Sequence, residues 1–237
     1  PARCSVNFER HLNVNSDSIF HTGLGDPEGP VLLPTGEWGL VEMTPETGCV
    51  SVVSPDGGSR RVIVKTGRPN GMAQDSSGSL WVAESMNPPS LLKVELDGRN
   101  EVMMTEGDGI EFMFPNDLAF GPDGVLYMTD SGVHRGPFVK ACEEGRTDFP
   151  IDGKLFRIDL EDMTASVLDD GLQFANGLAF GVDRALYVTA TITGMLYRYE
   201  WNDDGTLGSR EDFADLVDRS QPLGFTGGDG IAVGENG

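Results

Sequence analysis

Short apolar segments return along this chain in a fixed pattern that defines a repeat. Each copy opens with Asn or Asp, then Gly or Asp, an apolar residue and Ala: Asn70-Gly71-Met72-Ala73, Asn116-Asp117-Leu118-Ala119, Asn176-Gly177-Leu178-Ala179 and Asp229-Gly230-Ile231-Ala232. Three copies are followed, ten residues after their start, by a second apolar run: Leu80-Trp81-Val82-Ala83, Leu126-Tyr127-Met128-Thr129 and Leu186-Tyr187-Val188-Thr189. A turn glycine, Gly78 or Gly124, precedes two of these runs, and Arg184 takes its place in the third. The constant spacing predicts equivalent β-hairpins.

The same spacing identifies an earlier copy, Glu28-Gly29-Pro30-Val31. Gly36 falls eight residues after Glu28, and the run Trp38-Gly39-Leu40-Val41 begins ten residues after it. Glu28 therefore holds the position that Asn or Asp holds in the other copies.

Two further apolar runs follow each hairpin. The third run is seen in Leu91-Leu92-Lys93-Val94, Leu155-Phe156-Arg157-Ile158 and Leu196-Tyr197-Arg198-Tyr199, and the fourth in Arg61-Val62-Ile63-Val64, Glu101-Val102-Met103-Met104 and Ala165-Ser166-Val167-Leu168. Four strands in each unit predict the blades of an all-β propeller, whereas solenoid repeats are shorter and lack four strands.

Blades begin near residues 28, 70, 116, 176 and 229, and the last one stops at its turn glycine, Gly237. We therefore expect one incomplete propeller domain over residues 1–237, truncated at the C-terminus, because ending in mid-hairpin leaves strand edges unpaired. The alternating segment 6–14 is expected to add an outer strand that closes the ring.

The first residues of the repeats should converge on the propeller axis, because the innermost strand of every blade lines the central channel. All are oxygen donors: Glu28, Asn70, Asn116, Asn176 and Asp229. Such a set suits a hard divalent cation such as Ca²⁺, Mg²⁺ or Mn²⁺, and the absence of His and Cys from it disfavours Zn²⁺. The alternative is turn chemistry, which Asn-Gly pairs favour, but glutamate at position 28 has no such advantage.

Charge and cysteine content narrow the class of protein. Seventeen Lys and Arg stand against 38 Asp and Glu, so the net charge of −21 disfavours binding to nucleic acid or to an anionic membrane surface. Three widely spaced cysteines support neither a zinc site nor a disulfide framework, and we expect a cytoplasmic protein. Because the first residue is Pro1, a signal peptide that has been removed is the alternative.

The motifs resemble those of the senescence marker protein, gluconolactonase and regucalcin family, which is related to the paraoxonases in fold. The matching pieces are Pro27-Glu28-Gly29-Pro30, Phe114-Pro115-Asn116-Asp117, Ala175-Asn176-Gly177-Leu178 and Gly228-Asp229-Gly230-Ile231. The resemblance implies a six-bladed propeller with one catalytic divalent cation, Ca²⁺ first, with Mg²⁺, Mn²⁺ or Zn²⁺ as substitutes in vitro. Its implied ligands are Glu28, Asn176 and Asp229, with Asn116 either a ligand or a substrate contact and Asp117 in support.

The resemblance also implies metal-assisted hydrolysis of a small lactone or ester, with water as the nucleophile. Asp229 is the candidate general base, although a carboxylate bound to a dication is normally a weak base. Paraoxonases carry a histidine at the position of Asn70, so a histidine-driven mechanism is not expected, and Asn70 is assigned to substrate or to a metal-bound water.

Loops after the second strand of each blade should lie at the channel mouth: residues 84–90, 130–152 and 191–194. The middle loop is unusually long and carries His134 and Arg135, which we assign to substrate binding, with a solvated surface loop as the alternative. Asp130, at its start, is a weaker candidate for supporting the metal or binding a second calcium ion.

The leading hypothesis is a metal-dependent lactonase of the gluconolactonase type. A related esterase or organophosphate hydrolase would differ at the mouth alone. A calcium-binding propeller without catalysis is the third hypothesis, and the incomplete ligand set, which leaves room for water or substrate, favours an enzyme.

Overall fold

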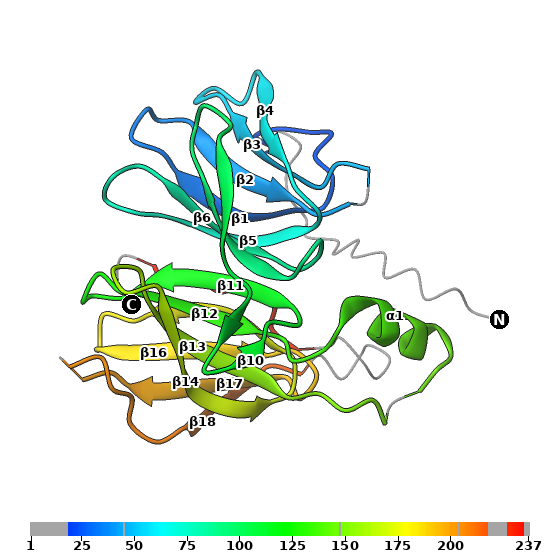
Figure 1. Cartoon of the computed structure of the whole chain (residues 1–237), viewed down its shortest axis with the longest axis vertical. Helices are drawn as coiled ribbons and strands as arrows, with labels where there is room; N and C mark the ends of the chain where they lie inside the picture. The colour runs from blue at the N-terminus through cyan, green and yellow to red at the C-terminus, as the bar shows by residue number, and fades with distance from the viewer. Residues whose placement is uncertain (1–18, 45, 147, 203, 218–226, 235–237) are drawn as a thin grey trace.

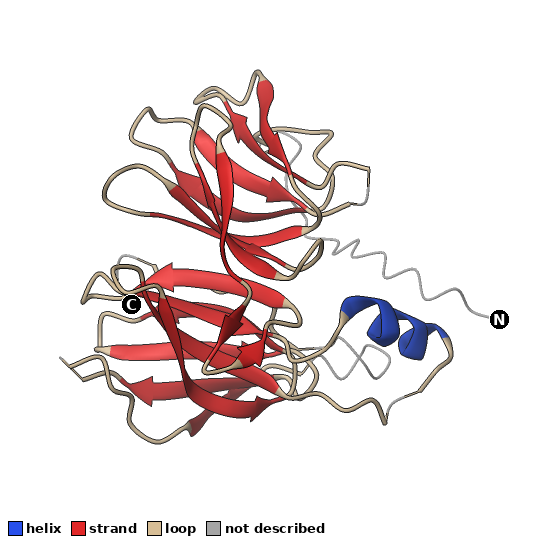
Figure 2. Cartoon of the chain, in the orientation of Figure 1, coloured by secondary structure: helices blue, strands red, loops and turns tan. Residues whose placement is uncertain are grey.

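The computed structural model describes residues 19–44, 46–146, 148–202, 204–217 and 227–234. In those ranges the secondary structure is almost entirely β, with eighteen strands and one helix (Figures 1 and 2). The predicted all-β class is confirmed. The described helix, α1 (Arg135–Glu143), is nine residues long, and none in these ranges is long and apolar enough to cross a membrane.

Four four-stranded antiparallel sheets form the blades, each in simple sequential order. The first contains β1 (Pro27–Leu32), β2 (Trp38–Glu42), β3 (Cys49–Val53) and β4 (Arg60–Lys65). The second contains β5 (Pro69–Gln74), β6 (Leu80–Glu84), β7 (Ser90–Val94) and β8 (Asn100–Met104). The third contains β11 (Pro115–Phe120), β12 (Leu126–Asp130), β13 (Gly153–Asp159) and β14 (Thr164–Leu172). The fourth contains β15 (Ala175–Phe180), β16 (Ala185–Ala190), β17 (Met195–Glu200) and β18 (Glu211–Asp215). Every strand of the predicted repeat is present in these blades.

The hydrophobic core lies between neighbouring blades, as a propeller requires. Val50 of the first blade packs with Leu80 of the second, Trp81 of the second with Phe156 of the third, and Leu155 of the third with Leu186 of the fourth, each in its own buried cluster. Burying such side chains stabilises the fold by roughly 1.5–3 kcal/mol each. Each sheet therefore covers one face of the next.

The hairpin turns explain the one departure from the glycine pattern. Gly36, Gly78 and Gly124 all adopt positive φ angles, of 82°, 94° and 77°, and Arg184 adopts the same region with φ 61°. An arginine there is strained where glycine is not. Its guanidinium lies over the ring of Trp201, 5.7 Å from the centroid, which offsets part of that cost.

Inner strands β1, β5, β11 and β15 contact one another in that order, so they form one wall of the channel. Figure 1 shows β1 and β5 in one half of the molecule and β11 with the later strands in the other. Small residues let these strands approach closely: a Cβ added to Gly71 would lie 2.6 Å from Cα of Asp117.

Three expectations from the sequence need correction or lie outside the described residues. Residues 229–234, expected to begin a fifth blade, form no strand and pair with no described strand. The loop 130–152 contains α1, and a small hairpin of β9 (Glu106–Gly107) and β10 (Ile110–Glu111), which the repeat pattern does not predict, precedes the third blade. Segment 6–14 and Gly237 lie outside the described residues, and the count of six blades stays a prediction.

Candidate active site

A β-bulge marks the start of every inner strand, at the predicted channel position. The register between first and second strands shifts between Glu28 and Val31 in the first blade, and at the equivalent places from Pro69, Pro115 and Ala175 in the next three. A bulge re-aims the side chains that it contains. Asn70, Asn116 and Asn176 lie within their bulges and Glu28 lies directly before its own, so all four are at the start of their inner strands.

Burial of these residues is uneven. Asn70, Asn116 and Asn176 are 9%, 6% and 6% exposed, while Glu28 is partly buried. Asp229 is exposed and lies beside Gly177 of β15, and the hydroxyl of Thr189 on β16 donates to its carbonyl oxygen at 2.8 Å. The structure thus brings the predicted inner-strand residues together and sets Asp229 beside the last of them.

Two asparagines are held by a hydroxyl relay that the sequence analysis missed. Nδ2 of Asn116 donates to Oγ of Ser131 at 2.9 Å, and Ser131 donates to the carbonyl oxygen of Ala175. Nδ2 of Asn176 donates to Oγ1 of Thr191 at 2.9 Å, and Thr191 donates to the carbonyl oxygen of Gly228. A signal exists in the sequence, because each hydroxyl follows its asparagine by fifteen residues.

The relay determines which atom of each amide is left for a ligand. Both nitrogens are used, and neither Oδ1 of Asn116 nor Oδ1 of Asn176 accepts a hydrogen bond from a described residue. The side chain of Asn70 makes no hydrogen bond within the same ranges. Buried amide groups normally have partners, so these oxygens are suited to a cation, and Asn70 to a ligand or water.

Threonines on the second strands of the third and fourth blades also connect neighbouring blades. Oγ1 of Thr129 donates to the carbonyl oxygen of Asn176 at 2.5 Å, and Thr189 makes the equivalent bond to Asp229. The first two blades carry Val41 and Ala83 at this register, so the link is confined to the side of the channel that holds Asn116, Asn176 and Asp229.

The carboxylates of the channel perturb one another. Burial, then the charges of Asp229 and Asp117, raises the pKa of Glu28 to about 7. Burial raises the pKa of Asp117 to about 6, although its carboxylate accepts backbone hydrogen bonds from Leu118 and Leu178, and Asp229 raises it further. Like charges that face a common space favour a bound proton or a bound cation.

The donor set fits a hard cation. Glu28 and Asp229 would contribute carboxylates, and Asn116 and Asn176 amide oxygens. Among the described residues no three His, Cys, Asp or Glu side chains lie close enough to hold a metal by themselves. Oxygen donors of this kind suit Ca²⁺ better than Zn²⁺.

Asp130 has a different task from the one considered in the sequence. It is buried, and its carboxylate accepts hydrogen bonds from the backbone N–H groups of Met113, Phe114 and Gly132 at 2.9, 3.0 and 2.8 Å. Glu84 ties the loop before Asn70 in the same way. Burial raises the pKa of Asp130, and its oxygens stabilise the loop before the inner strand.

The mouth is bordered by α1, which stands on an aromatic cluster. Phe138 of α1 packs against Phe174, and Phe174 against Phe114, with ring centroids 5.4 and 5.7 Å apart. His134 precedes α1, is exposed, and makes no side-chain cap hydrogen bond. Among the described residues, no contact joins His134 to the predicted channel positions. The charge of Arg135, the other loop residue predicted to bind substrate, acts on Arg68.

Arg68 is the mouth residue that the sequence analysis missed. Its guanidinium lies over the ring of Phe114, 5.3 Å from the centroid, and its Nη1 donates to Oγ of Ser85 at 3.3 Å. Burial and the charge of Arg135 lower the pKa of Arg68 to about 10, while Asp26, Glu28 and Glu84 oppose them. Arg68 therefore lies between the channel carboxylates and α1, and its place two residues before Asn70 was the available signal.

Comparison with known proteins agrees with this architecture. The chain is 30% identical over 155 residues to protein STRICTOSIDINE SYNTHASE-LIKE 10 of Arabidopsis thaliana, covering 63% of this chain and 40% of that protein. It is 28% identical over 176 residues to a gluconolactonase of Zymomonas mobilis, covering 68% of this chain and 48% of that protein. The chain thus spans less than half the length of either relative.

Solved structures support the fold. A gluconolactonase from Xanthomonas campestris superposes with a TM-score of 0.67 at 23% identity, over 82% of this chain and 64% of that one. The calcium-binding protein regucalcin from Agrobacterium tumefaciens gives 0.61 at 16% identity, over 84% and 62%. At these identities the likeness concerns the β-propeller fold alone.

A sequence model of a whole protein family matches a longer part of this chain than any of the relatives named above. The model of the SMP-30/gluconolactonase/LRE-like region matches residues 27–237, from the residue before Glu28 to the end of the sequence. The motifs noted in the sequence therefore identify it correctly, and the chain belongs to the SMP-30/gluconolactonase/LRE-like family.

Proposed function

We propose that this protein is a metal-dependent hydrolase that opens the ring of a small lactone. The observation that carries the proposal is the pair of buried amides of Asn116 and Asn176, whose nitrogens are held by Ser131 and Thr191 and whose oxygens accept no hydrogen bond from a described residue. Membership of a family that includes a gluconolactonase supports it. The chain is also similar to proteins named strictosidine synthase-like. The choice of a lactonase function therefore rests on the residues of the channel and not on the relatives alone.

Glu28, Asn176 and Asp229 would hold the cation, with Asn116 as a fourth donor. A bound divalent cation, Ca²⁺ first, would polarise the lactone carbonyl and stabilise negative charge on its oxygen. Ser131 and Thr191 keep the two amides turned so that their oxygens face the ligand. Second-layer hydrogen bonds of this kind orient ligands and tune affinity.

The reaction needs a proton acceptor for the attacking water. Asp229 is exposed, so solvent and substrate reach its carboxylate. In the proposed reaction, water adds to the carbonyl carbon, Asp229 takes its proton, and the bond from that carbon to the ring oxygen breaks. The proton then passes to the departing oxygen, which becomes the alcohol of a hydroxy acid. Asn70 and Asp117 would hold the substrate during these steps.

The test is acid release from a panel of lactones, aryl esters and organophosphates, with the full chain first stripped of metal and then supplied with Ca²⁺. We expect lactone hydrolysis that disappears on stripping, returns with Ca²⁺ and is lost in Asp229→Asn. Asp212→Asn, an exposed acid on β18, is the matched control and should keep the native rate. Full activity without metal contradicts the proposal.

The same panel decides between the alternatives. Turnover confined to aryl esters or organophosphates would assign the related hydrolase function. Calorimetric binding of Ca²⁺ with no turnover of any substrate would assign a calcium-binding propeller, the description that regucalcin carries.

A further inference from the structure

Two arginines at the channel mouth differ from most of the ten arginines that the structure describes. Seven form an ion pair within 4 Å of a carboxylate: Arg60, Arg61, Arg99, Arg146, Arg157, Arg198 and Arg210. Arg68 and Arg135 form none with any described residue. Acidic residues outnumber basic residues by 38 to 17 in this chain, so most of its arginines have a carboxylate partner.

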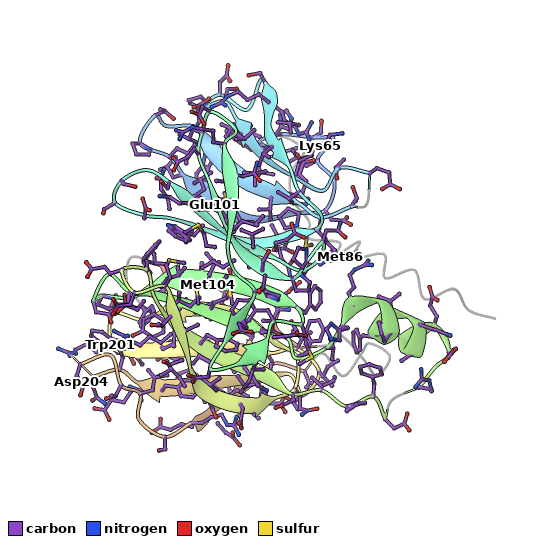
Figure 3. The ribbon with its side chains drawn as sticks, in the orientation of Figure 1. Lys65, Met86, Glu101, Met104, Trp201 and Asp204 are labelled. Carbon is purple, nitrogen blue, oxygen red and sulfur yellow. The ribbon has the colours of Figure 1, made fainter. Side chains whose placement is uncertain are left out.

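The two arginines are connected through the aromatic cluster beneath α1. Arg68 rests on Phe114, whose ring packs on Phe174 and through it on Phe138 of α1. Arg135 is the first residue of that helix, and the first turn of α1 carries no acidic residue. Figure 3 places Met86, in the loop that Glu84 anchors beside Arg68, on the same side of the molecule as α1, with Trp201 at the opposite end. The charge of Arg135 lowers the pKa of Arg68, second only to burial.

We propose that Arg68 and Arg135 together bind an anionic substituent of the substrate, so that the preferred substrate is a lactone that carries a carboxylate. This inference rests on the proposed lactonase function and names its substrate class. Guanidinium groups match carboxylates with paired hydrogen bonds, and an anion between two like charges relieves their repulsion. The lactone ring would then extend from the arginines toward Glu28, whose charge also acts on Arg68.

The negative charge of the channel carboxylates explains why an anionic substrate would need both Arg68 and Arg135. Glu28, Asp117 and Asp229 would repel a free carboxylate, even after one cation is bound. A neutral sugar lactone needs no cationic partner, and hydroxyl groups are served by asparagines. Two arginines at the mouth that form no ion pair with a described residue are therefore better explained by an acidic substrate than by a neutral one.

The kinetic test compares two sugar lactones with the full chain and saturating Ca²⁺: gluconolactone, which is neutral, and glucarolactone, which carries a carboxylate. For Arg135→Gln we expect the ratio of kcat/KM for glucarolactone to kcat/KM for gluconolactone to fall roughly 10-fold, through a higher KM for glucarolactone. Arg146→Gln, which removes the same charge from the loop after α1, is the control and should leave both substrates unchanged. Equal loss on both lactones, or no loss on glucarolactone, overturns the proposal.

A binding measurement separates this proposal from the proposed function. Calorimetry on protein stripped of metal compares glucarate with sorbitol, its uncharged counterpart. We expect glucarate to bind more tightly to the native protein than to Arg68→Gln or Arg135→Gln, and sorbitol to bind all three equally weakly. If no lactone is hydrolysed the function fails, and this measurement still decides on the arginines. Equal binding of glucarate to native and variant proteins overturns the pair.

Discussion

Asn116 and Ser131 are joined by a hydrogen bond of 2.9 Å from the amide Nδ2 to the hydroxyl, although fifteen residues separate them in the sequence. Ser131 donates in turn to the carbonyl oxygen of Ala175 in the next blade. One hydroxyl therefore sets the rotation of an amide in the channel and also connects two blades. Asn176 and Thr191 repeat the arrangement one blade further on.

Removing the hydroxyl of Ser131 should weaken metal binding more than folding. In Ser131→Ala the amide of Asn116 loses the partner that fixes its orientation, so we expect the affinity for Ca²⁺ to fall about 10–100-fold. The free energy of unfolding should fall by about 1–3 kcal/mol, because the carbonyl of Ala175 loses its donor. Calcium titration by calorimetry and urea unfolding measure the two effects.

Ser90→Ala is the matched control for this experiment. Ser90 is also fully buried, and its hydroxyl donates to the carbonyl oxygen of Pro88, away from the inner strands. We expect a comparable loss of stability and an unchanged affinity for Ca²⁺. An equal loss of affinity in both variants would mean that Ser131 acts through general stability alone.

The raised pKa of Glu28 predicts how stability changes with pH in the metal-free protein. Its pKa is about 7 in the folded state against 4.5 in the unfolded state, so the folded state binds more protons between these values. The free energy of unfolding should therefore fall as pH rises from 4.5 to 7. We expect a fall on the order of 1–2 kcal/mol, less than the full shift implies because Glu28 is partly exposed to solvent.

Unfolding midpoints measured across this pH range, with and without Ca²⁺, test the prediction. Glu28→Gln should flatten the slope of the metal-free protein, and Ca²⁺ should do the same for the native chain because the cation replaces the proton. An unaltered slope in Glu28→Gln would show that other groups cause the pH dependence.

Asp130 distinguishes a loop anchor from a second metal site. In Asp130→Asn, an amide N–H group replaces an oxygen that accepts backbone hydrogen bonds, so buried donors face one another. We expect the free energy of unfolding to fall by about 2–3 kcal/mol and the number of bound Ca²⁺ ions to stay the same. Asp97→Asn, in an exposed turn, should change neither quantity. Loss of a bound ion in Asp130→Asn at unchanged stability would contradict the anchor role.

The parts of the fold that the sequence predicted are those that repeat. Apolar and polar residues alternate in the strands, and the strands recur at a fixed spacing. The positions of Glu28, Asn116 and Asn176 at the start of the inner strands therefore followed from counting residues within each repeat. The relay through Ser131 and Thr191 was missed because its acceptors belong to the next blade, some forty residues away. Helix α1 was missed because it has no repeated counterpart and is held by aromatic packing of Phe138 rather than by a strong helical pattern. Arg68 was missed because its role depends on the charge of Arg135, and the sequence gives no sign that the two residues interact.

Gly71 tests the close approach of inner strands on which the channel depends. A Cβ at this position would lie 2.6 Å from Cα of Asp117 and 2.7 Å from the carbonyl oxygen of Asn116, so backbone would have to move. We expect Gly71→Ala to lower the free energy of unfolding by about 2–4 kcal/mol and to reduce the affinity for Ca²⁺, because β5 and β11 separate at Asn116. Gly136→Ala is the control: it lies in α1, and a Cβ there meets nothing within 4 Å. That substitution should stabilise the protein by about 0.5–1 kcal/mol through helix propensity. Urea unfolding of both variants decides the matter, since a Gly71→Ala protein as stable as the native chain would mean that the inner strands are not in the close contact described.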